Sequence, residues 1–385
     1  MPTKKAFARI AARDIESGAD VPPFDTSHMD GFAIRAADSI GASEAEPREL
    51  TLIGSVPLAR APSRRLTSRE AVGVSTGSYL PRGADAVVPV EEGTVVGGKL
   101  RIVREVTRGS FVFGAGEDVP RGKLIVKMGS VIRGQDVGML VGLGIRRVKV
   151  WRRPRVAILA TGNELTNSTS SRTKKTRNSH APVFLAMAAA VGCDVVDLGI
   201  APDQAGVILS RVSQGVRKAD VVLMTGGTSV GKLDLADQVL PRLRPEVLCH
   251  GLRMDRGRVA GLAVVRRKGI VMMPGPIQGA MNAFILLGLP MIAKLSGSKA
   301  PEILVNARLT KRWEARKKFP DFTKVVYLRV TRTRSGPAAE PLAGETESMS
   351  LLTDSNAYAV VPEQTTSLEA GEVIEARLLP GFSFA

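Results

Sequence analysis

A short, mostly apolar run that ends in glycines constrains the fold of this chain more than any other feature. Residues 219–224 read Ala-Asp-Val-Val-Leu-Met, and Thr225-Gly226-Gly227 and then Asp234 follow them. A β-branched, apolar run bounded by glycines is typical of a buried parallel strand. Glycines behind such a strand let the backbone approach a ligand, and ligands of open α/β sheets bind beyond the carboxyl ends of the strands. Asp234 is therefore placed to hold a metal ion or a polar substrate.

The same pattern occurs at two other places. Residues 156–160 lead into Thr161-Gly162-Asn163-Glu164, and residues 270–273 lead into Pro274-Gly275-Pro276. Three buried strands that end in glycine loops, two of them carrying an acid, suggest one shared edge of a parallel sheet. The alternative is purely structural, because any α/β domain needs turn glycines at its strand ends.

Length and composition indicate a soluble protein of several domains. A chain of 385 residues with 44% hydrophobic content is too long for one ordinary core, and it predicts about two to four domains. No apolar stretch reaches the roughly 18 residues of a membrane helix, and residues 1–13 lack the apolar core of a signal peptide. Cys193 and Cys249 are isolated, so neither a disulfide framework nor a CxxC metal site is indicated. We therefore expect a cytoplasmic protein that does not enter the membrane.

The formal net charge of +17 favours anionic partners. Nucleic acid is a poor candidate, because aromatic residues make up only 4% of the chain and no zinc-finger, helix-turn-helix or RNA-binding signature is visible. Two interpretations remain. The basic runs form solvated faces, or they attract a polyanionic small molecule.

Alternating strand and helix signals place an α/β domain at residues 151–297. The expected strands are 156–160, 193–198, 219–224, 259–265 and 270–273, and the expected helices are 181–191, 204–217, 234–243 and 277–294. This series predicts a doubly wound parallel sheet with helices on both faces.

Three further segments complete the expected organisation. Residues 31–115 show short β-rich runs punctuated by glycine and proline, which predict an inserted small β domain. Residues 1–30 and 116–150 together form a discontinuous N-terminal or linker domain, and residues 298–385 form a C-terminal β domain. The expected fold class is mixed α/β and multidomain, with one doubly wound parallel domain flanked by small β-rich domains.

Six short motifs occur in a fixed order along the chain. They are Pro23-Phe24-Asp25-Thr26-Ser27-His28-Met29-Asp30-Gly31-Phe32-Ala33, residues 75–88, Gly116-Glu117-Asp118-Val119, Thr161-Gly162-Asn163-Glu164-Leu165, Asp203 after Pro202, and residues 226–234. In order and spacing they resemble the molybdopterin molybdenumtransferase family (the gephyrin E-domain type), whose α/β domain is of the molybdopterin-binding type. The resemblance extends from about residue 8 to residue 380.

The resemblance implies an enzyme of molybdenum cofactor biosynthesis. Family members are homodimers of elongated four-domain subunits, with the active site between the α/β domain of one subunit and the small β domain of the other. They take adenylylated molybdopterin and molybdate or tungstate, hydrolyse the adenylate with a divalent cation, usually Mg²⁺, and release AMP and the cofactor. The sequence does not choose between molybdate and tungstate, because the two oxyanions are nearly the same size.

The resemblance also assigns site residues. The family's catalytic acids and hydroxyl fall on Asp30, Thr76, Asp118, Glu164, Asp203 and Asp234. Glu164 and Asp234 are the expected Mg²⁺ ligands, because Mg²⁺ prefers one or two carboxylates together with waters and substrate phosphates. Asp30 and Asp118 are expected to orient molybdate or the pterin. The expected substrate-binding residues are Thr161, Gly162, Gly226, Gly227, Ser229, Arg253, Arg258, Pro274 and Gly275. For each acid taken alone, a capping or salt-bridge role is the alternative.

Two segments depart from the family pattern. Family members carry a Pro-Gly-Lys-Pro core after the aspartate loop, whereas residues 250–259 of this chain place Asp255 where a basic residue is expected. Arg253 and Arg256 are expected to restore the positive field from adjacent positions, although arginine and lysine are not interchangeable. The later Pro-Gly-Asn-Pro loop is altered to Pro-Gly-Pro-Ile at residues 274–277. An alternative function is therefore a catalytically degenerate paralogue that binds molybdopterin or nucleotide as a carrier or partner subunit.

Overall fold

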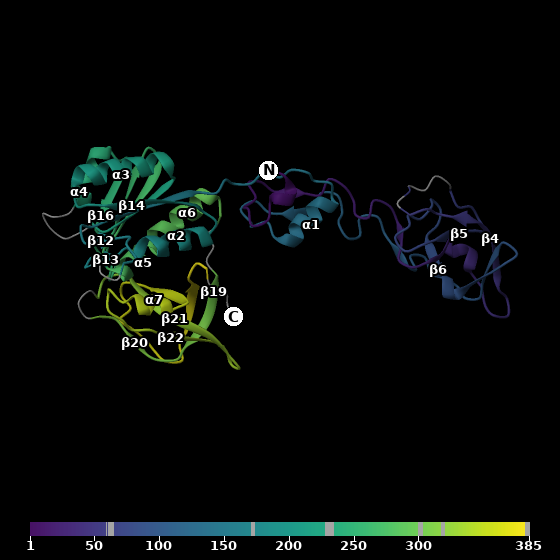
Figure 1. Ribbon diagram of the computed structural model, residues 1–385. Coiled ribbons are helices and arrows are strands. Elements are labelled where there is room, and N and C mark those ends of the chain that lie inside the picture. Colours follow the sequence, from purple (N-terminus) through teal and green to yellow (C-terminus); the bar gives the residue numbers. More distant parts are fainter. Residues whose placement is uncertain are drawn as a thin grey trace. The chain divides into compact units, whose positions relative to one another are not determined.

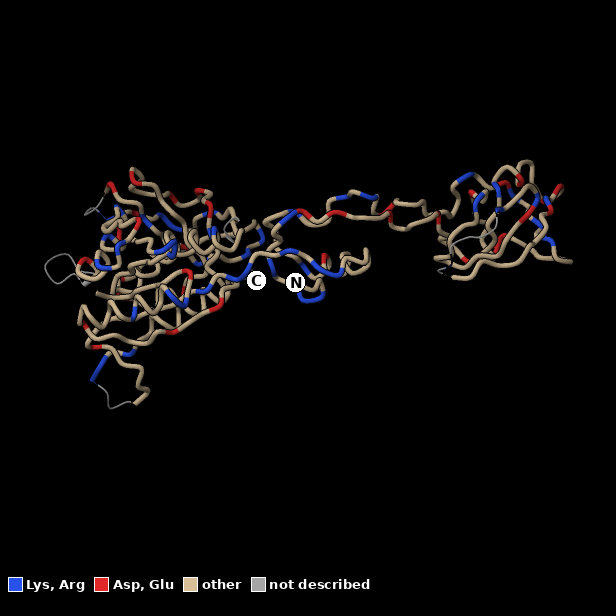
Figure 2. Tube along the Cα trace, turned by 90° about the horizontal axis from the view of Figure 1, so that it is seen from above, with Lys and Arg blue, Asp and Glu red and all other residues tan. Residues whose placement is uncertain are grey.

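The computed structural model describes residues 1–58, 60, 65–170, 174–227, 235–298, 303–316 and 320–381. The chain forms two compact units, Met1–Val150 and Trp151–Ala385 (Figure 1). Lys and Arg positions are spread along both units with Asp and Glu positions among them, so the net positive charge is not confined to one segment (Figure 2).

The second unit contains a six-stranded sheet in the order β14-β11-β15-β18-β17-β16. Its strands are β11 (Arg155–Thr161), β14 (Asp194–Ala201), β15 (Val221–Thr225), β16 (Val247–His250), β17 (Gly261–Val265) and β18 (Lys268–Met273). The first four strands in that order run parallel, which confirms the predicted parallel sheet for this part. A separate short pair, β12 (Leu165–Thr166) and β13 (Thr176–Arg177), follows β11 in the chain.

The prediction of a wholly parallel sheet is wrong for β17 and β16, which pair antiparallel. The cause is the two-residue turn Arg266-Arg267 between β17 and β18, where φ is 52° and 60°. Two consecutive residues with positive φ make a tight hairpin turn, and two residues are too few for the crossover that parallel strands need. Such turns usually carry Asn or Gly, so the arginine pair gave no hairpin signal in the sequence.

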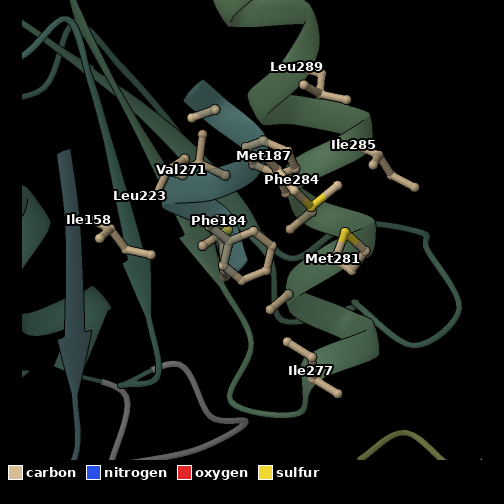
Figure 3. Close-up of a cluster of buried hydrophobic side chains, with 14 of the residues drawn as sticks. Ile158, Phe184, Met187, Leu223, Val271, Ile277, Met281, Phe284, Ile285 and Leu289 are labelled. Atoms are coloured by element: carbon tan, nitrogen blue, oxygen red, sulfur yellow. The ribbon is translucent and has the colours of Figure 1, made fainter. Parts of the chain in front are cut away.

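Helices cover both faces of the sheet, as predicted. They are α2 (His180–Ala190), α3 (Ala205–Lys218), α4 (Leu235–Val239), η4 (Leu240–Leu243), α5 (Ile277–Ala283), η5 (Phe284–Gly288) and α6 (Leu289–Ser296). Because side chains alternate along a strand, Leu223 shares a core cluster with Phe184 and Phe284, whereas its neighbour Val222 shares another with Ile208 of α3 (Figure 3). Both faces of the strands are thus buried.

The segments α5, η5 and α6 form one helix, Ile277–Ser296, of 20 residues and mean hydropathy 1.4. Its length and composition would suffice to cross a membrane, so the expectation that no apolar stretch reaches this length is wrong here. Within the protein 67% of an 18-residue window of this helix is buried, and Met281, Phe284 and Ile285 lie in the core cluster beside the sheet (Figure 3). The apolar side chains therefore serve the core.

A closed barrel in the order β19-β22-β21-β23-β25 ends the second unit. Its elements are β19 (Leu304–Leu309), β21 (Lys324–Thr333), β22 (Gly336–Pro341), α7 (Met349–Asp354), β23 (Ala357–Val361) and β25 (Val373–Leu378), and β20 (Trp313–Glu314) pairs with β24 (Ser367–Leu368). Leu328 and Ala359 lie in the core cluster of the barrel, whereas Tyr327 and Tyr358 belong to the cluster that contains Phe284. The barrel is therefore packed on the helix Ile277–Ser296.

The first unit contains a six-stranded sheet in the order β6-β3-β5-β4-β8-β7 and two short strand pairs, β1-β10 and β2-β9. Its strands are β1 (Ile15–Glu16), β2 (Thr26–Ser27), β3 (Gly31–Ile34), β4 (Arg48–Ser55), β5 (Glu70–Val74), β6 (Ala86–Pro89), β7 (Gly93–Val96), β8 (Lys99–Ile102), β9 (Val112–Phe113) and β10 (Leu124–Val126). Its helices are η1 (Thr3–Lys5), η2 (Ala36–Ser39), η3 (Val90–Glu92) and α1 (Gly134–Gly142).

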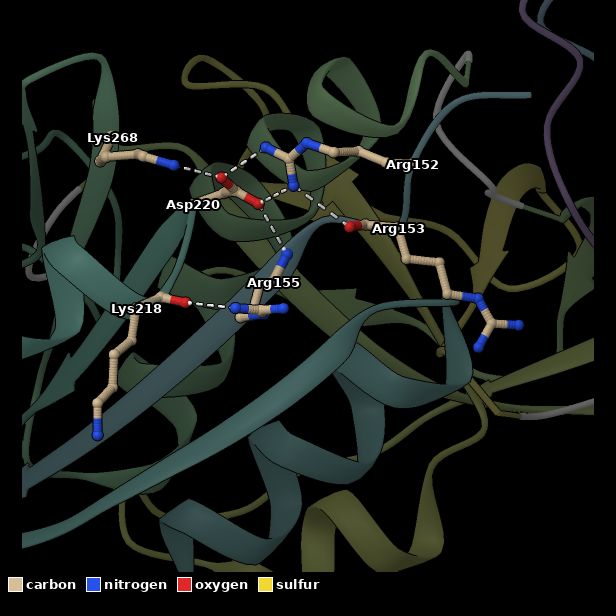
Figure 4. Close-up of polar contacts among 6 residues, drawn as sticks. All are labelled: Arg152, Arg153, Arg155, Lys218, Asp220 and Lys268. Carbon is tan, nitrogen blue, oxygen red and sulfur yellow. Dashed lines mark hydrogen bonds and ion pairs between the residues drawn. The ribbon is translucent and has the colours of Figure 1, made fainter. Parts of the chain in front are cut away.

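A buried carboxylate fixes the edge of the α/β sheet where β11 and β15 begin (Figure 4). Asp220 accepts hydrogen bonds from the Arg152 guanidinium at 2.6 and 2.7 Å, from Lys268 Nζ at 2.5 Å and from the Arg155 N–H at 2.9 Å. Its side chain is only 5% exposed. The hydrogen bonds from Arg152, followed by those from Arg155 and Lys268, outweigh burial and hold the pKa of Asp220 well below its ordinary value.

We expect Asp220→Asn to lower the free energy of unfolding by about 2–4 kcal/mol at pH 7, because the buried pairs lose their charge. The native pKa lies below the unfolded one, so this stabilisation is complete above the unfolded pKa, near about 4, and is lost as the pH falls through the lower native value. Urea denaturation at pH 7 and pH 3 should show the difference from wild type shrinking in acid.

The control is Asp194→Asn, at the exposed first residue of β14, which should change the unfolding free energy by less than about 0.5 kcal/mol. A difference between wild type and Asp220→Asn that stays constant from pH 7 to pH 3 would contradict the role given to the carboxylate.

Candidate functional site

Three of the loops singled out in the sequence leave the same edge of the α/β sheet. In the parallel register, Ala160 of β11 lies opposite Thr225 of β15, and Thr225 lies opposite Met273 of β18. The loops that begin at Gly162, Gly226 and Pro274 therefore start side by side. This is the carboxyl edge at which open α/β sheets bind ligands.

The loop that begins at Gly226 requires close approach of two backbones. Gly226 has φ of +79°, and a Cβ at this position would lie 2.5 Å from the carbonyl oxygen of Thr161. The Gly226 N–H donates to the Met273 oxygen at 3.1 Å, and the Thr161 hydroxyl donates to the Thr225 oxygen at 3.2 Å. Only glycine tolerates both the positive φ and the close approach to the Thr161 oxygen, which is the physical cause of the predicted glycine turn.

Glu164 is folded back over the end of β11. Gly162 has φ of +151°, and a Cβ there would collide with the Glu164 carboxylate. The Gly162 N–H donates to the oxygen of Ala201, the last residue of the neighbouring strand β14, at 3.1 Å. The absence of a side chain at Gly162 thus leaves room for the exposed Glu164 carboxylate at the end of β11.

A reciprocal pair of hydrogen bonds brings Asp203 to the same place. The Asn163 N–H donates to Asp203 Oδ2 at 3.1 Å, and the Asp203 N–H donates to Asn163 Oδ1 at 3.2 Å. Asp203 and Glu164 therefore flank Asn163. On the same loop, Lys175 Nζ donates to the Asn163 oxygen at 2.9 Å. Within the described part of the chain, neither the Glu164 carboxylate nor the second oxygen of Asp203 makes a hydrogen bond or ion pair.

The side chains of this site supply only part of the ligand shell that a magnesium ion needs. Two carboxylates with exposed oxygens are the usual protein share of a Mg²⁺ shell, and waters and phosphate oxygens supply the rest. No group of three possible metal-ligating side chains occurs among the residues that the structure describes. Ser229 and Asp234, predicted as a substrate-binding residue and a metal ligand, lie outside those residues. Gly227 is described, and its oxygen accepts the Ala236 N–H at 3.2 Å.

A cavity of about 630 Å³ opens between the α/β domain and the barrel within the second unit. Its lining residues are Asp255, Arg256, Gln278, Asn282, Arg312, Trp313, Glu314, Arg316, Lys324, Val325, Val326, Tyr327, Pro341, Leu342, Ala343, Gly344, Glu345 and Leu351. It adjoins the carboxyl edge through the first turn of α5, which follows the Pro274 loop and carries Gln278.

The two arginines predicted to bind substrate do not line this cavity. The Arg253 guanidinium donates to the Asp321 oxygen at 3.1 Å and lies 3.9 Å from Glu363. Arg258 is exposed, and its backbone oxygen accepts the Leu252 N–H. Arg256, named in the sequence only as a neighbouring positive charge, lines the cavity instead.

The remaining predicted residues lie in the first unit. Asp30 Oδ1 accepts the Thr76 N–H at 2.6 Å and the Thr76 hydroxyl at 3.1 Å, so the structure brings these two residues together. Asp118 is bonded elsewhere: its N–H donates to the Val21 oxygen, and its own oxygen accepts Lys123 Nζ at 2.8 Å. Nothing in the described part of this unit joins Asp118 to Asp30.

Comparison with family models matches nearly the whole chain in three parts. Residues 1–144 match the MoeA N-terminal region (domain I and II), residues 157–294 match a probable molybdopterin binding domain, and residues 306–379 match the MoeA C-terminal region (domain IV). The chain is also similar to the molybdopterin molybdenumtransferase of Staphylococcus aureus (strain COL), with 28% identity over 374 residues, 97% of this chain and 89% of that protein.

Two solved structures share the fold along most of their length. A molybdopterin biosynthesis MoeA protein from Pyrococcus horikoshii is 30% identical, with a TM-score of 0.88 over 99% of this chain and 94% of the other. A second crystal structure of such a protein from Pyrococcus horikoshii OT3 is 28% identical, with a TM-score of 0.80 over 98% and 93%.

We expect Gly226→Ala to destabilise the protein by about 2–4 kcal/mol, because an alanine with positive φ is strained and its Cβ would meet the Thr161 oxygen. Gly275→Ala is the matched control, since Gly275 leaves the same sheet edge and a Cβ there would meet no atom within 4 Å. Thermal unfolding should show a loss of several degrees for the first variant only. Equal melting temperatures for the two variants would contradict the close backbone approach.

Proposed function

The chain belongs to the MoeA family of molybdopterin molybdenumtransferases, and within molybdenum cofactor biosynthesis we propose that it inserts molybdate or tungstate into adenylylated molybdopterin. The reaction proposed hydrolyses the adenylate with Mg²⁺ and releases AMP. The observation that carries the proposal is the pair Glu164 and Asp203, whose carboxylates flank Asn163 at the carboxyl edge of the sheet.

In this proposal the strand-end carboxylates hold the cation and the glycine loops receive the phosphate. Cleaving a phosphoanhydride places negative charge on phosphate oxygens, and a divalent cation neutralises that charge. Glu164 and Asp203 would hold the cation together with Asp234. The loop at Gly226 and Gly227 offers backbone N–H groups without side chains in the way, which suits a phosphate. Lys175 would add a positive charge beside Asn163.

Further parts of the proposal rest on the family resemblance. We propose that the protein acts as a homodimer in the cytoplasm, and that Asp30, Thr76 and Asp118 orient the pterin or the oxyanion. The hydrogen bonds between Asp30 and Thr76 support a common role for these two residues.

The direct test mixes the purified protein with adenylylated molybdopterin, Mg²⁺ and molybdate and follows AMP by chromatography. The proposal predicts catalytic release of AMP that requires Mg²⁺. Tight binding of adenylylated molybdopterin with no AMP above background would instead assign the protein to the carrier function.

We expect Asp203→Asn to lower the rate of AMP release by about 100-fold and to raise the Mg²⁺ concentration needed for half-maximal rate. The matched control is Asp194→Asn, because Asp194 is an exposed aspartate at the opposite end of β14, the strand that Asp203 follows. Unfolding should be unchanged in both variants, since both side chains are exposed. A normal Mg²⁺ dependence in Asp203→Asn would remove this residue from the proposed site.

A further inference from the structure

Two pairs of aromatic rings lie close together in the first unit, although aromatic residues make up only 4% of the chain. The rings of Phe24 and Tyr79 pack edge to face with their centroids 5.1 Å apart, and those of His28 and Phe113 lie 5.0 Å apart. Phe24 and His28 belong to the motif that contains Asp30. The rings therefore lie within a motif that the proposed function uses.

Three short segments pair side by side and place both ring pairs on one face. Thr26 of β2 lies opposite Tyr79 on one side and opposite Phe113 of β9 on the other, antiparallel to both. Residues opposite each other in neighbouring strands point to the same face, and so do residues two apart along one strand. Phe24 and His28 lie two residues either side of Thr26. These two residues, Tyr79 and Phe113 form what we call the aromatic face.

The other face of these segments is turned toward the protein core. Ser27 is buried beside Thr26, and Val112 of β9 packs against a core cluster of the first unit that contains Leu80. All four residues of the aromatic face are exposed or half-buried. Thr26 is only 8% exposed although it lies on the same side as the rings, because they flank it. The aromatic face is thus an outer surface.

The carboxylate of Asp30 lies at the end of the same paired segments. The Gly77 N–H donates to the Ser27 oxygen at 2.8 Å, so the pairing continues in this direction. Asp30 Oδ1 accepts the Thr76 N–H and hydroxyl, whereas Oδ2 makes no hydrogen bond or ion pair within the described part of the chain. An exposed hydrogen-bond acceptor therefore lies two residues beyond the aromatic face.

A flat ring with N–H groups on one edge suits this combination. Aromatic side chains stack on the face of any planar heterocycle, and a carboxylate accepts N–H groups from its edge. A pterin carries an amino group and an amide N–H side by side on one edge. Adenine places a ring nitrogen acceptor beside its amino group, and that acceptor would repel a carboxylate. A phosphate is likewise repelled by the negative charge of Asp30.

We propose that the aromatic face binds the pterin ring of the substrate, with Tyr79 and Phe113 as stacking residues and Asp30 Oδ2 as the acceptor for a pterin N–H. His28 packs against Phe113 and holds the plane of its ring. The identity of the heterocycle rests on the proposed function. The three ring residues lie outside the set of site residues that the family resemblance assigns.

Phe113→Leu separates ring stacking from apolar packing. Leucine keeps apolar contact area but has no aromatic face, whereas Phe113→Tyr keeps the ring. A purely structural role of Phe113 would change stability and leave the affinity for a ligand unaltered. Tyr79→Leu removes a second ring independently. The matched control is Phe7→Leu, because Phe7 is an exposed phenylalanine of the same unit that lies outside the paired segments.

The experiment titrates the full-length protein with 6-hydroxymethylpterin, followed by the fluorescence of the pterin, and with adenosine, followed by calorimetry. We expect wild type, Phe7→Leu and Phe113→Tyr to bind the pterin with equal affinity. Phe113→Leu and Tyr79→Leu should bind it at least about tenfold more weakly, because each loses a stacked ring. Adenosine should bind the wild type more weakly than the pterin does. The melting temperature of Phe113→Leu should stay close to that of wild type.

Absence of pterin binding to the wild type, or equal affinity in wild type and Phe113→Leu, would overturn the proposed role of the aromatic face. Tighter binding of adenosine than of the pterin would also overturn it. The release of AMP tests the proposed function separately. Pterin binding that Phe113→Leu weakens, in a protein that releases no AMP, would retain the aromatic face as a pterin site and reject the turnover. AMP release by Phe113→Leu with the KM of wild type would retain the turnover and reject the pterin site.

Discussion

The parallel register of β11, β15 and β18 is the constraint on which the site depends. Because Thr225 lies opposite both Ala160 and Met273, three loops leave one edge together. The close packing of Gly226 on the Thr161 backbone then fixes the distance between two of these loops. Helices buried on both faces hold the strands in this register, and the carboxylates of Glu164 and Asp203 stand on the edge that results.

The structural features that could be predicted from the sequence are those determined by residues close together in the chain. Apolar runs predicted β11, β15 and β18, and glycines behind them predicted backbone approach, because both signals lie within a few residues. The antiparallel hairpin of β17 and β18 escaped prediction, since its turn is made by Arg266 and Arg267 in a conformation that favours Asn and Gly.

The features that were missed depend on contacts between distant residues. Arg256 meets Gln278 and Gly344, and Tyr327 meets Asn282, across large separations in the chain. No local pattern marks these residues, because each polar pair forms only when distant parts of the chain pack together. The pairing of Asp203 with Asn163 is of the same kind, although the resemblance had already named Asp203. A basic stretch in a sequence shows that charge is present, but only packing decides which arginine enters a cavity.

The proposed function requires that carboxylates at the sheet edge hold a divalent cation. Crystals grown with Mn²⁺ in place of Mg²⁺, together with AMP, would locate the cation by its anomalous scattering. We expect a peak within coordination distance of Glu164 and Asp203, beside the AMP phosphate. A bound AMP with its cation at another place in the protein, and no peak near these two carboxylates, would contradict it.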